Sequence, residues 1–326
     1  MKNGFLLGIL TTFAMCAAAQ SAQTRAPQTP DFSKVEIHTL PVQGNVYMLV
    51  GDGGNITLQA GKDGVLLVDT GYGPPSDKLM AAIRKISNGP IRYIINTHVH
   101  GDHTGGNENM AKLGSTIAGG NVAGNISDAS VGAAIVAHEN VLNRMSSAKP
   151  PLAFGMLPTD TYFTAGKNLF FNGEAVQLIH IPDAHTDGDS FVFFRRSDVL
   201  STGDIFTPGN YPIIDLARGG NVQGIIAGLN KIIEITVPAD KQEGGTYVIP
   251  GHGRLCDQAD VVEYRDMVTI IRDRIQDSVK KGMSLEQVKE SKPTRDYDPL
   301  YGTTTGFWTT DMFVEAVYRS LSPKGK

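Results

Sequence analysis

The chain has 326 residues, of which 41% are hydrophobic and 19% charged, a composition that supports one large or two small globular domains. Its formal net charge of −4, with no long basic run, excludes the electrostatic footprint of a nucleic-acid-binding protein. We therefore expect a small-molecule partner and no nucleic acid. The oligomeric state stays open at this point.

The first residues have the pattern of a targeting segment. Lys2 is followed by an uncharged, largely apolar run from Phe5 to Ala19 that ends in three alanines. This pattern predicts a cleaved signal peptide over residues 1–19 and a periplasmic or secreted protein. The run is shorter than the ~20 apolar residues of a membrane span, so we expect no stable membrane insertion after cleavage. An uncleaved membrane anchor is the alternative.

The two cysteines give no disulfide framework. Cys16 lies inside the expected signal peptide, where Met15 precedes it instead of the small residue typical of a lipoprotein signal, and lipidation stays open. Cleavage after Ala19 leaves Cys256 as the single thiol. We therefore expect stability to come from the core and from bound metal.

The first half of the chain reads as strands followed by a helix and a further strand. Residues 20–32 are rich in Gln, Ser, Thr and Pro and predict a flexible segment. Apolar runs between glycine turns predict strands at 46–50, 56–58 and 65–68. Residues 76–88 predict a helix, and the β-branched run at 91–96 predicts a buried strand.

The second half repeats that order. Ser127-Asp128 predicts the start of a helix over 127–146, and Pro150-Pro151 opens a connection to about Gly166 that is either a lid or a solvated crossover. Strands are predicted at 169–172, 175–181, 191–195, 198–201 and 246–249, and helices at 221–235, 258–281, 284–290 and 307–321.

Sheet followed by helices, twice over, predicts the α/β class and a four-layer αβ/βα sandwich. No clean linker divides the chain. We expect a single domain over residues 33–326, with a C-terminal helical extension from about residue 258.

A dense group of metal-binding side chains follows the strand predicted at 91–96. His98 and His100 are two residues apart, so an extended backbone directs both to one side. Gly101 permits a sharp turn, and Asp102 and His103 follow it. Imidazole and carboxylate are zinc ligands, so this loop predicts a metal site with donors for two ions.

Three later strands also end at a potential ligand. His185 follows the strand at 175–181, Asp204 follows 198–201, and His252 follows 246–249. Each lies in a loop that contains glycine or proline. Functional sites of α/β folds are commonly built from loops that follow the ends of strands. His138, expected on a helix, and His180, expected in a strand, are interpreted as packing or surface residues.

Taken together, these motifs resemble those of the metallo-β-lactamase superfamily. The resemblance rests on His98-x-His100-x-Asp102-His103 and on His185, Asp204 and His252 at their spacings. It also covers Val68-Asp69-Thr70-Gly71, Ala184-His185-Thr186-x-Gly188-Asp189 and Pro250-Gly251-His252-Gly253, and it spans about residues 35–255. It implies the same metallo-β-lactamase-like sandwich that the element order predicts.

The resemblance also implies a role for each residue. His98, His100 and His185 would bind a first zinc ion, Asp102, His103 and His252 a second, and Asp204 both. Asp69 would orient the metal loop by hydrogen bonding, and its alternative is a strand-end turn residue.

The implied activity is that of a di-zinc hydrolase. A metal-bridging hydroxide would attack the carbonyl of an amide, lactam, lactone or ester, with Asp102 orienting the nucleophile and shuttling a proton. β-Lactamase activity is included as an expectation, and iron or manganese in place of zinc stays open. Two alternatives remain: an iron enzyme of the persulfide-dioxygenase type with one metal, and a non-enzymatic periplasmic metal-binding module.

Asp204 bears on the substrate. Related metallo-β-lactamases tend to carry cysteine or serine at this position, whereas an aspartate is typical of thioesterases, lactonases and related hydrolases. Tyr211, shortly after Asp204, is either a donor to an oxyanion or a packing residue. The physiological substrate is left open, because the loops that would select it have no predictable shape.

Overall fold

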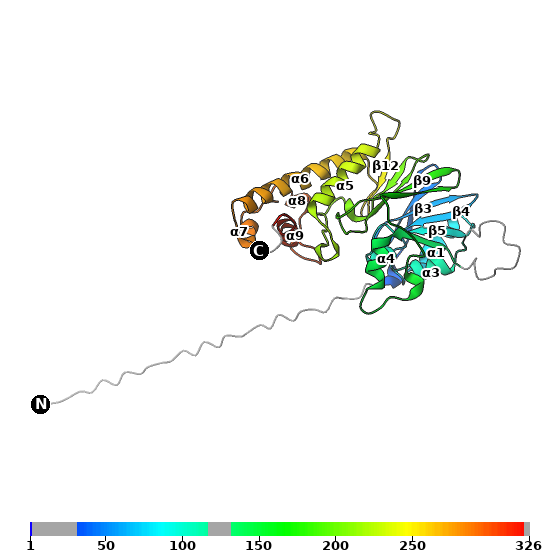
Figure 1. The fold of residues 1–326 in the computed structure, drawn as a ribbon, viewed down its shortest axis with the longest axis horizontal. Helices are drawn as coiled ribbons and strands as arrows, with labels where there is room; N and C mark the ends of the chain where they lie inside the picture. Colours follow the sequence, from blue (N-terminus) through cyan, green and yellow to red (C-terminus); the bar gives the residue numbers. More distant parts are fainter. Residues whose placement is uncertain (2–30, 117–131, 323–326) are drawn as a thin grey trace. The chain divides into compact units, whose positions relative to one another are not determined.

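Two β-sheets lie face to face in the computed structural model, which describes Met1, residues 31–116 and residues 132–322 (Figure 1). The first sheet has the strand order β1 (His38–Gln43), β2 (Val46–Val50), β3 (Ile56–Gly61), β4 (Gly64–Val68), β5 (Ile91–Ile95), β6 (Ala134–His138) and β7 (Asp160–Tyr162). Its strands pair antiparallel from β1 to β4 and parallel from β4 to β7.

The second sheet is smaller. Its order is β12 (Tyr247–Ile249), β11 (Val199–Ser201), β10 (Ser190–Phe194), β9 (Glu174–His180) and β8 (Gly166–Phe171). All its neighbours pair antiparallel except β11 and β12, which are parallel. The parallel pair places the ends of β11 and β12, where Asp204 and His252 follow, at the same edge.

The alternation of side chains along β4 explains the layers. Leu66 and Val68 pack in the core between the two sheets, whereas Val65 and Leu67 pack in a second core on the outer face of the first sheet. Since a strand with helices on one face and a sheet on the other is buried on both, its sequence is continuously apolar.

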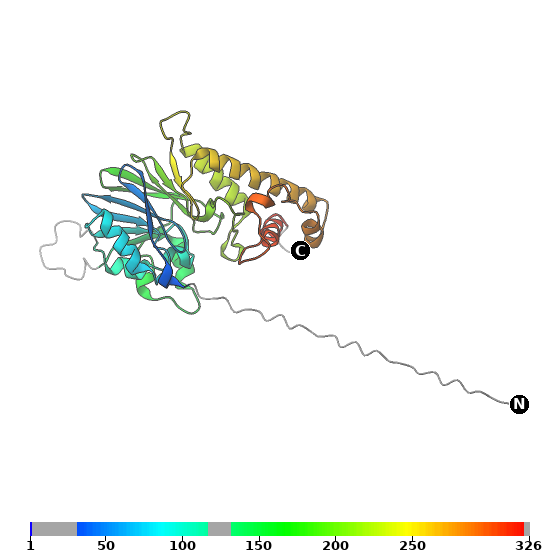
Figure 2. The ribbon, with the colours of Figure 1, turned by 180° about the vertical axis from the view of Figure 1, so that it is seen from behind.

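Helices cover both outer faces. On the first sheet these are α1 (Ser76–Ile86) and α3 (Asn107–Lys112), and Figure 2 shows α1 in cyan against the blue strands. On the second sheet they are α5 (Val222–Ile235) and α6 (Gln258–Lys280), and α9 (Thr310–Leu321) packs against these two helices. The apolar sides of all three belong to the largest core cluster. The expected four-layer αβ/βα sandwich is confirmed.

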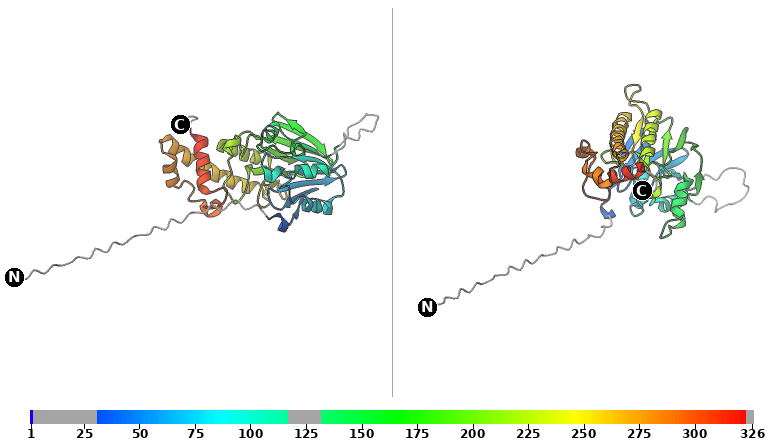
Figure 3. Two further views of the ribbon diagram at one scale, coloured as in Figure 1. Left: turned by 90° about the horizontal axis from the view of Figure 1, so that it is seen from below. Right: turned by 60° about the vertical axis from the view of Figure 1, so that its left-hand side comes forward.

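The remaining short helices are loop elements. They are α2 (Gly101–Thr104), α4 (Glu139–Ser146), α7 (Leu285–Glu290) and α8 (Asp298–Tyr301), with 3₁₀ turns at Phe32–Lys34, Phe154–Met156, Gly203–Ile205 and Leu216–Arg218. Figure 3 shows that α7, α8 and α9 gather at one end of the sandwich. This end lies beside the metal-ligand candidates, because residues of α9 line the same cavity as His100, Asp102 and His252.

One predicted element is wrong. The helix expected over 127–146 is a strand, β6, followed by the short helix α4, while residues 127–131 lie outside the described residues. Ile135, Val136 and Ala137 are buried between β5 and β7, where a β-branched parallel strand fits better than a helix. His138 therefore caps the start of α4 and accepts a hydrogen bond from the Asn140 backbone N–H.

The connection predicted after Pro150 also contains structure that the sequence did not indicate. It holds a 3₁₀ turn and the edge strand β7, whose three residues pair with the end of β6. Such a short strand has too few residues for a visible alternation.

Phe32–Lys326 form one compact unit. The expected signal peptide after Met1, and the expected flexible segment up to residue 30, lie outside the described residues. Among the described helices, none combines the length and the apolar character that crossing a membrane requires.

Candidate metal centre

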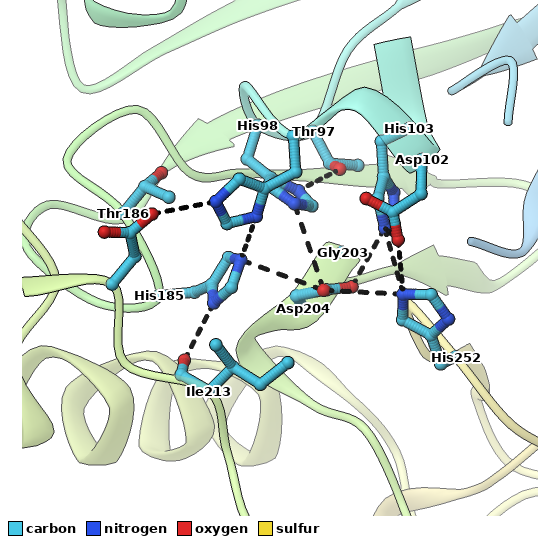
Figure 4. A network of polar contacts seen from close by, with 12 residues as sticks. Thr97, His98, Asp102, His103, His185, Thr186, Gly203, Asp204, Ile213 and His252 are labelled. Atoms are coloured by element: carbon cyan, nitrogen blue, oxygen red, sulfur yellow. Dashed lines mark hydrogen bonds and ion pairs between the residues drawn. The ribbon is translucent and has the colours of Figure 1, made fainter. Parts of the chain in front are cut away.

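The candidate metal ligands meet at one edge of the sandwich, where strands of both sheets end. The loop after β5 contributes His98 and His100, and α2 contributes Asp102 and His103. The other three, His185, Asp204 and His252, come from the turn between β9 and β10 and from the residues after β11 and β12. Figure 4 shows the rings of His98, His103, His185 and His252 arranged around Asp204. The structure thus brings together all seven residues that the sequence suggested as ligands.

Their donor atoms form two groups, each with all donor atoms within 4.8 Å of one another. One group is His98, His100, His185 and Asp204, and the other is Asp102, His103 and His252. These are the two sets that the family resemblance implied.

Asp204 lies between the two groups. Its Oδ2 is 3.8 Å from His185 Nε2 in the first group, and its Oδ1 is 3.1 Å from His103 Nε2 in the second. The side chain is 4% exposed. A carboxylate so placed can offer one oxygen to each group.

Three histidines of these groups have one ring nitrogen fixed by a hydrogen bond to an oxygen outside them. His185 Nδ1 donates to the carbonyl of Ile213 at 2.7 Å, and His103 Nδ1 to Asp69 Oδ2 at 2.7 Å. His100 Nε2 donates to Asp215 Oδ2 at 2.9 Å. In each ring the second nitrogen is left facing the cluster, which is the arrangement by which proteins orient metal-binding imidazoles.

Asp69 is the main organiser of the loop after β5. Besides accepting from His103, it accepts from the Thr97 backbone N–H at 2.8 Å and from the Thr97 hydroxyl at 2.7 Å. Thr97 Oγ1 in turn lies 3.0 Å from His98 Nδ1. The orienting role expected of Asp69 agrees with these contacts. Asp69 also follows the end of β4 with a left-handed backbone (φ 64). The two alternatives, an orienting residue and a strand-end turn residue, are therefore compatible.

Two supporting aspartates were not predicted from the sequence. Asp215 holds His100 and is itself paired with Arg218 at 2.7 Å. Asp189 accepts from the backbone N–H and the hydroxyl of Thr186, and so closes the turn that carries His185. Asp215 is 115 residues from His100 in the chain, so spacing gave no signal, whereas Asp189 follows a recognisable Thr-x-Gly-Asp turn.

Burial keeps part of the cluster neutral. Burial, joined by the nearby imidazoles, lowers the pKa of His98 well below its usual value and that of His185 to about 4, so both rings carry free lone pairs at neutral pH. For Asp204, burial acts to raise the pKa, but the charge of His103 outweighs it and holds the pKa well below the usual range. His103 and His252 differ: the carboxylates of Asp204, Asp69 and Asp102 outweigh burial and raise the pKa of both rings, to about 9 for His252. A cation that binds the cluster therefore displaces protons from these two rings.

Two observations test whether a metal fits. Among the described residues, the buried atom His98 Nε2 has no hydrogen-bond partner, and Asp204 Oδ1 has only the ion-pair contact with His103 Nε2 at 3.1 Å. A buried polar atom without a partner costs free energy unless another group binds it. Glycines also make room for the ligands: a Cβ at Gly54 would collide with the His103 ring, and one at Gly251 with the Asp204 carboxylate. A buried donor atom without a partner, together with glycines that leave room for the ligand side chains, is the arrangement expected of a metal site.

The cluster is open on one side only. His98, His103 and His185 are buried, whereas His100, Asp102 and His252 are partly exposed, at 23%, 23% and 32%. These three, with Asp204, line a cavity of about 1140 Å³. A small molecule can therefore approach the cluster from this side.

Tyr211 does not act as the predicted oxyanion donor in this structure. Its hydroxyl lies 2.9 Å from Asp298 Oδ1 and 3.2 Å from the carbonyl of Thr294, and its ring stacks on Phe313. Burial and the Asp298 carboxylate raise the pKa of Tyr211. Tyr211 lines the cavity, but its proton is held by acceptors in the C-terminal helical region, which favours the packing alternative.

Comparisons with known proteins agree with this geometry. Residues 41–252 match the family model for the metallo-beta-lactamase superfamily. The chain is 26% identical over 284 residues to a linear primary-alkylsulfatase from Pseudomonas sp., which corresponds to 74% of this chain and 52% of that protein. It therefore spans about half the length of this curated relative.

Solved structures share the fold. The stereoselective inverting sec-alkylsulfatase Pisa1 from Pseudomonas sp. superimposes with a TM-score of 0.62 at 15% identity, covering 87% of this chain and 50% of its own. A metallo-beta-lactamase from Pontibacter korlensis superimposes with a TM-score of 0.54 at 15% identity, covering 72% of this chain and 99% of its own.

Proposed function

The chain belongs to the metallo-beta-lactamase superfamily, and on that premise we propose that it is a metal-dependent hydrolase with two zinc ions. His98, His100 and His185 would hold one ion, and Asp102, His103 and His252 the other, with Asp204 shared between them. The observation that supports this best is the convergence of seven donor side chains at the floor of an open cavity, with the buried Nε2 of His98 left without a hydrogen-bond partner.

When bound, zinc would lower the pKa of a water molecule and polarise the oxygen of the scissile group. Asp102 lies on the open side, with its Oδ2 3.2 Å from His252 Nε2. Burial acts to raise its pKa, but the hydrogen bond from His252 and the charge of His103 lower it below the usual value. Asp102 is therefore a carboxylate at neutral pH, able to accept a proton from water in the cavity and to deliver it to the leaving group.

The substrate we propose is a carbonyl compound: an ester, lactone, amide or lactam. The hydrolase family supports this class, and slow β-lactam hydrolysis is included in it. A second candidate is a sulfate ester, which the similarity to a linear primary-alkylsulfatase favours. Both reactions need an activated water and a stabilised oxyanion, so the cluster alone does not choose between them.

The test is metal analysis followed by a substrate panel on one sample of purified protein. Inductively coupled plasma mass spectrometry is expected to give about two zinc ions per chain. The zinc-loaded protein is then assayed with a p-nitrophenyl ester, a lactone, a thioester, nitrocefin and an alkyl sulfate. Turnover of a carbonyl substrate supports the first candidate, and turnover of the sulfate alone supports the second.

Other results would replace the proposal. Iron without zinc, together with oxygen consumption, would favour the iron dioxygenase alternative. Two bound zinc ions with no turnover of any substrate would leave a metal-binding module. The His98→Ala variant is the matched control, because it removes a buried ligand and should abolish both metal and turnover.

We further propose that the protein is exported, because Lys2 and the apolar run that ends at Ala19 have the pattern of a signal peptide. Cell fractionation followed by N-terminal sequencing tests this. Mature protein in the periplasm or medium, beginning at about residue 20, is the expected outcome, and full-length protein in the cytoplasm contradicts it.

A further inference from the structure

The cavity above the metal-ligand candidates has a wall that belongs to the C-terminal region. Phe307 and Trp308 in the loop before α9, and Met312, Glu315, Ala316 and Arg319 on α9, line the same cavity as His100, Asp102 and His252. We call these six residues the C-terminal wall. Figure 1 shows α9 close to the C-terminus, far along the chain from the strands that carry the ligands.

The C-terminal wall presents apolar side chains to solvent. Phe307 is 81% exposed and Met312 is 43% exposed. Leu216, on the loop that also carries Asp215, lines the cavity and is 37% exposed. Single exposed apolar residues are ordinary, but several that gather around one cavity mark a binding surface.

The C-terminal wall is fixed in place by the fold. Phe313 and Val317, on the same helix, are fully buried in the largest core cluster, where α9 packs against α5 and α6. The loop is closed by two hydrogen bonds between Thr303 and Thr310. Its apolar groups therefore face the cavity because the helix beneath them is anchored.

The charged members of the C-terminal wall are paired with neighbours. Glu315 binds Arg319 at 2.8 Å through Oε1 and Lys289 at 2.9 Å through Oε2. Such partnered charges do not compete with an apolar occupant for the surface around Met312 and Phe307. The metal-ligand side of the cavity is polar, whereas the opposite side combines the apolar groups of Phe307, Met312 and Ala316 with the paired charges of Glu315 and Arg319.

From this division we propose that the C-terminal wall binds an alkyl or aryl part of the substrate, so that the enzyme prefers esters with an extended apolar group over small hydrophilic ones. The proposal rests on the proposed hydrolase function and names its substrate class. A scissile group at the cluster and an apolar chain along α9 would fill the two sides of one cavity.

The first test is a chain-length series on the zinc-loaded protein. We expect kcat/KM to rise from p-nitrophenyl acetate through butyrate to hexanoate, by up to about fourfold for each methylene that becomes buried. In the double variant Phe307→Ala/Met312→Ala the hexanoate-to-acetate ratio should fall by about tenfold. Phe170→Ala is the matched control, because Phe170 is 77% exposed on β8 and does not line the cavity.

The second test is independent of turnover. Trp308 is the one tryptophan of the chain, so tryptophan fluorescence reports on the C-terminal wall alone. We expect 8-bromo-1-octanol to quench it saturably, 1-octanol to compete with the quencher, and Met312→Ala to weaken the effect. The Phe170→Ala variant should be quenched like the unmodified protein.

The two tests separate the failures. Saturable quenching without hydrolysis of any ester supports the C-terminal wall and overturns the hydrolase proposal. Ester hydrolysis with a flat chain-length series and no saturable quenching overturns the wall proposal and leaves the hydrolase. Absence of quenching in a protein that sediments as a dimer also overturns the wall proposal, since a second copy of the chain would then cover the C-terminal wall.

Discussion

Two groups of histidines lie near the same strand ends, and they differ in what surrounds them. The candidate metal centre brings together five: His98, His100, His103, His185 and His252. The other group is a pair, His138 and His180, whose rings stack with centroids 3.7 Å apart and planes 2° from parallel. Both groups contain buried rings, so burial alone does not distinguish a metal ligand from a packing residue.

Carboxylates make the difference. Rings of the metal centre donate to Asp69 and Asp215 and converge on Asp204. In the stacked pair, His138 Nδ1 accepts from a backbone N–H and His180 Nδ1 donates to the carbonyl of Asp189. Burial, together with the neighbouring ring of His180, lowers the pKa of His138 to about 4. The pair is thus a neutral packing contact, whereas the candidate metal centre combines neutral rings, His98 and His185, with rings whose pKa is raised by carboxylates, His103 and His252.

The largest expected effect comes from substituting one histidine of each group and comparing the two variants. His98→Ala should lower kcat/KM by about 10³-fold or more and reduce the bound zinc, because it removes a ligand and metal catalysis contributes several kcal/mol. His180→Ala should keep the zinc content and most of the activity. Loss of zinc from the His180→Ala protein would show that the two groups are not independent.

The next effect concerns Asp69. Asp69→Asn should weaken zinc binding by about 100-fold, since residues that orient metal ligands typically contribute 10–100-fold. Asparagine tolerates the left-handed backbone at this position, so the fold should be kept. Chelator competition measures the affinity. Asp63→Asn is the control, because Asp63 accepts a backbone N–H from Asn172 away from the site, and equal affinities in both variants would refute the role of Asp69.

The stacked pair should affect stability against pH. Because the folded pKa of His138 is about 4, below the usual 6.5, the unfolded chain binds more protons between these values. The contribution of His138 to the free energy of unfolding is therefore fully present above pH 6.5 and is lost as the pH falls toward 4. The loss is about 2 kcal/mol, which corresponds to roughly 30-fold in the unfolding constant.

His138→Asn should remove this part of the pH dependence while keeping the cap of α4, since asparagine is also a good N-cap residue. Urea unfolding at pH 7 and pH 4.5 gives the difference between the two proteins, and acid release of metal is common to both. An unchanged difference between the two pH values would contradict the low pKa.

The smallest effect is expected at Asp215. Asp215→Asn should lower kcat/KM by about tenfold, at the weaker end for an orienting residue, because the side chain is 14% exposed and shared with Arg218. Asp187→Asn, which breaks a similar pair with Arg144, should leave activity near that of the unmodified protein. Equal losses in the two variants would assign Asp215 to loop stability alone.

These contrasts also show how far the sequence could be interpreted. The ligands of the metal centre were predictable because each follows a short apolar strand in a glycine or proline loop, and the motif around His98 is dense. The supporting contacts were not, since His100 and Asp215 meet only after both sheets have formed. His138 was expected on a helix because a short parallel strand and a helix share an apolar pattern over five residues.

The C-terminal helices were predicted as elements but not as part of the cavity. Nothing in the sequence of α9 distinguishes Met312, which faces the cavity, from Phe313, which is buried beside it. Their separation depends on how α9 is rotated against α5 and α6. Residue type alone does not encode that rotation.

The position of the metal centre has one further consequence. Its ligands come from both sheets, and the same edge is joined by Asn55, whose side chain donates to the carbonyls of Pro250 and Gly253. An ion bound there would link the two sheets of the sandwich to each other. Amide hydrogen exchange in β5, β11 and β12 should slow together when zinc is added, so that the two sheets open as one cooperative unit.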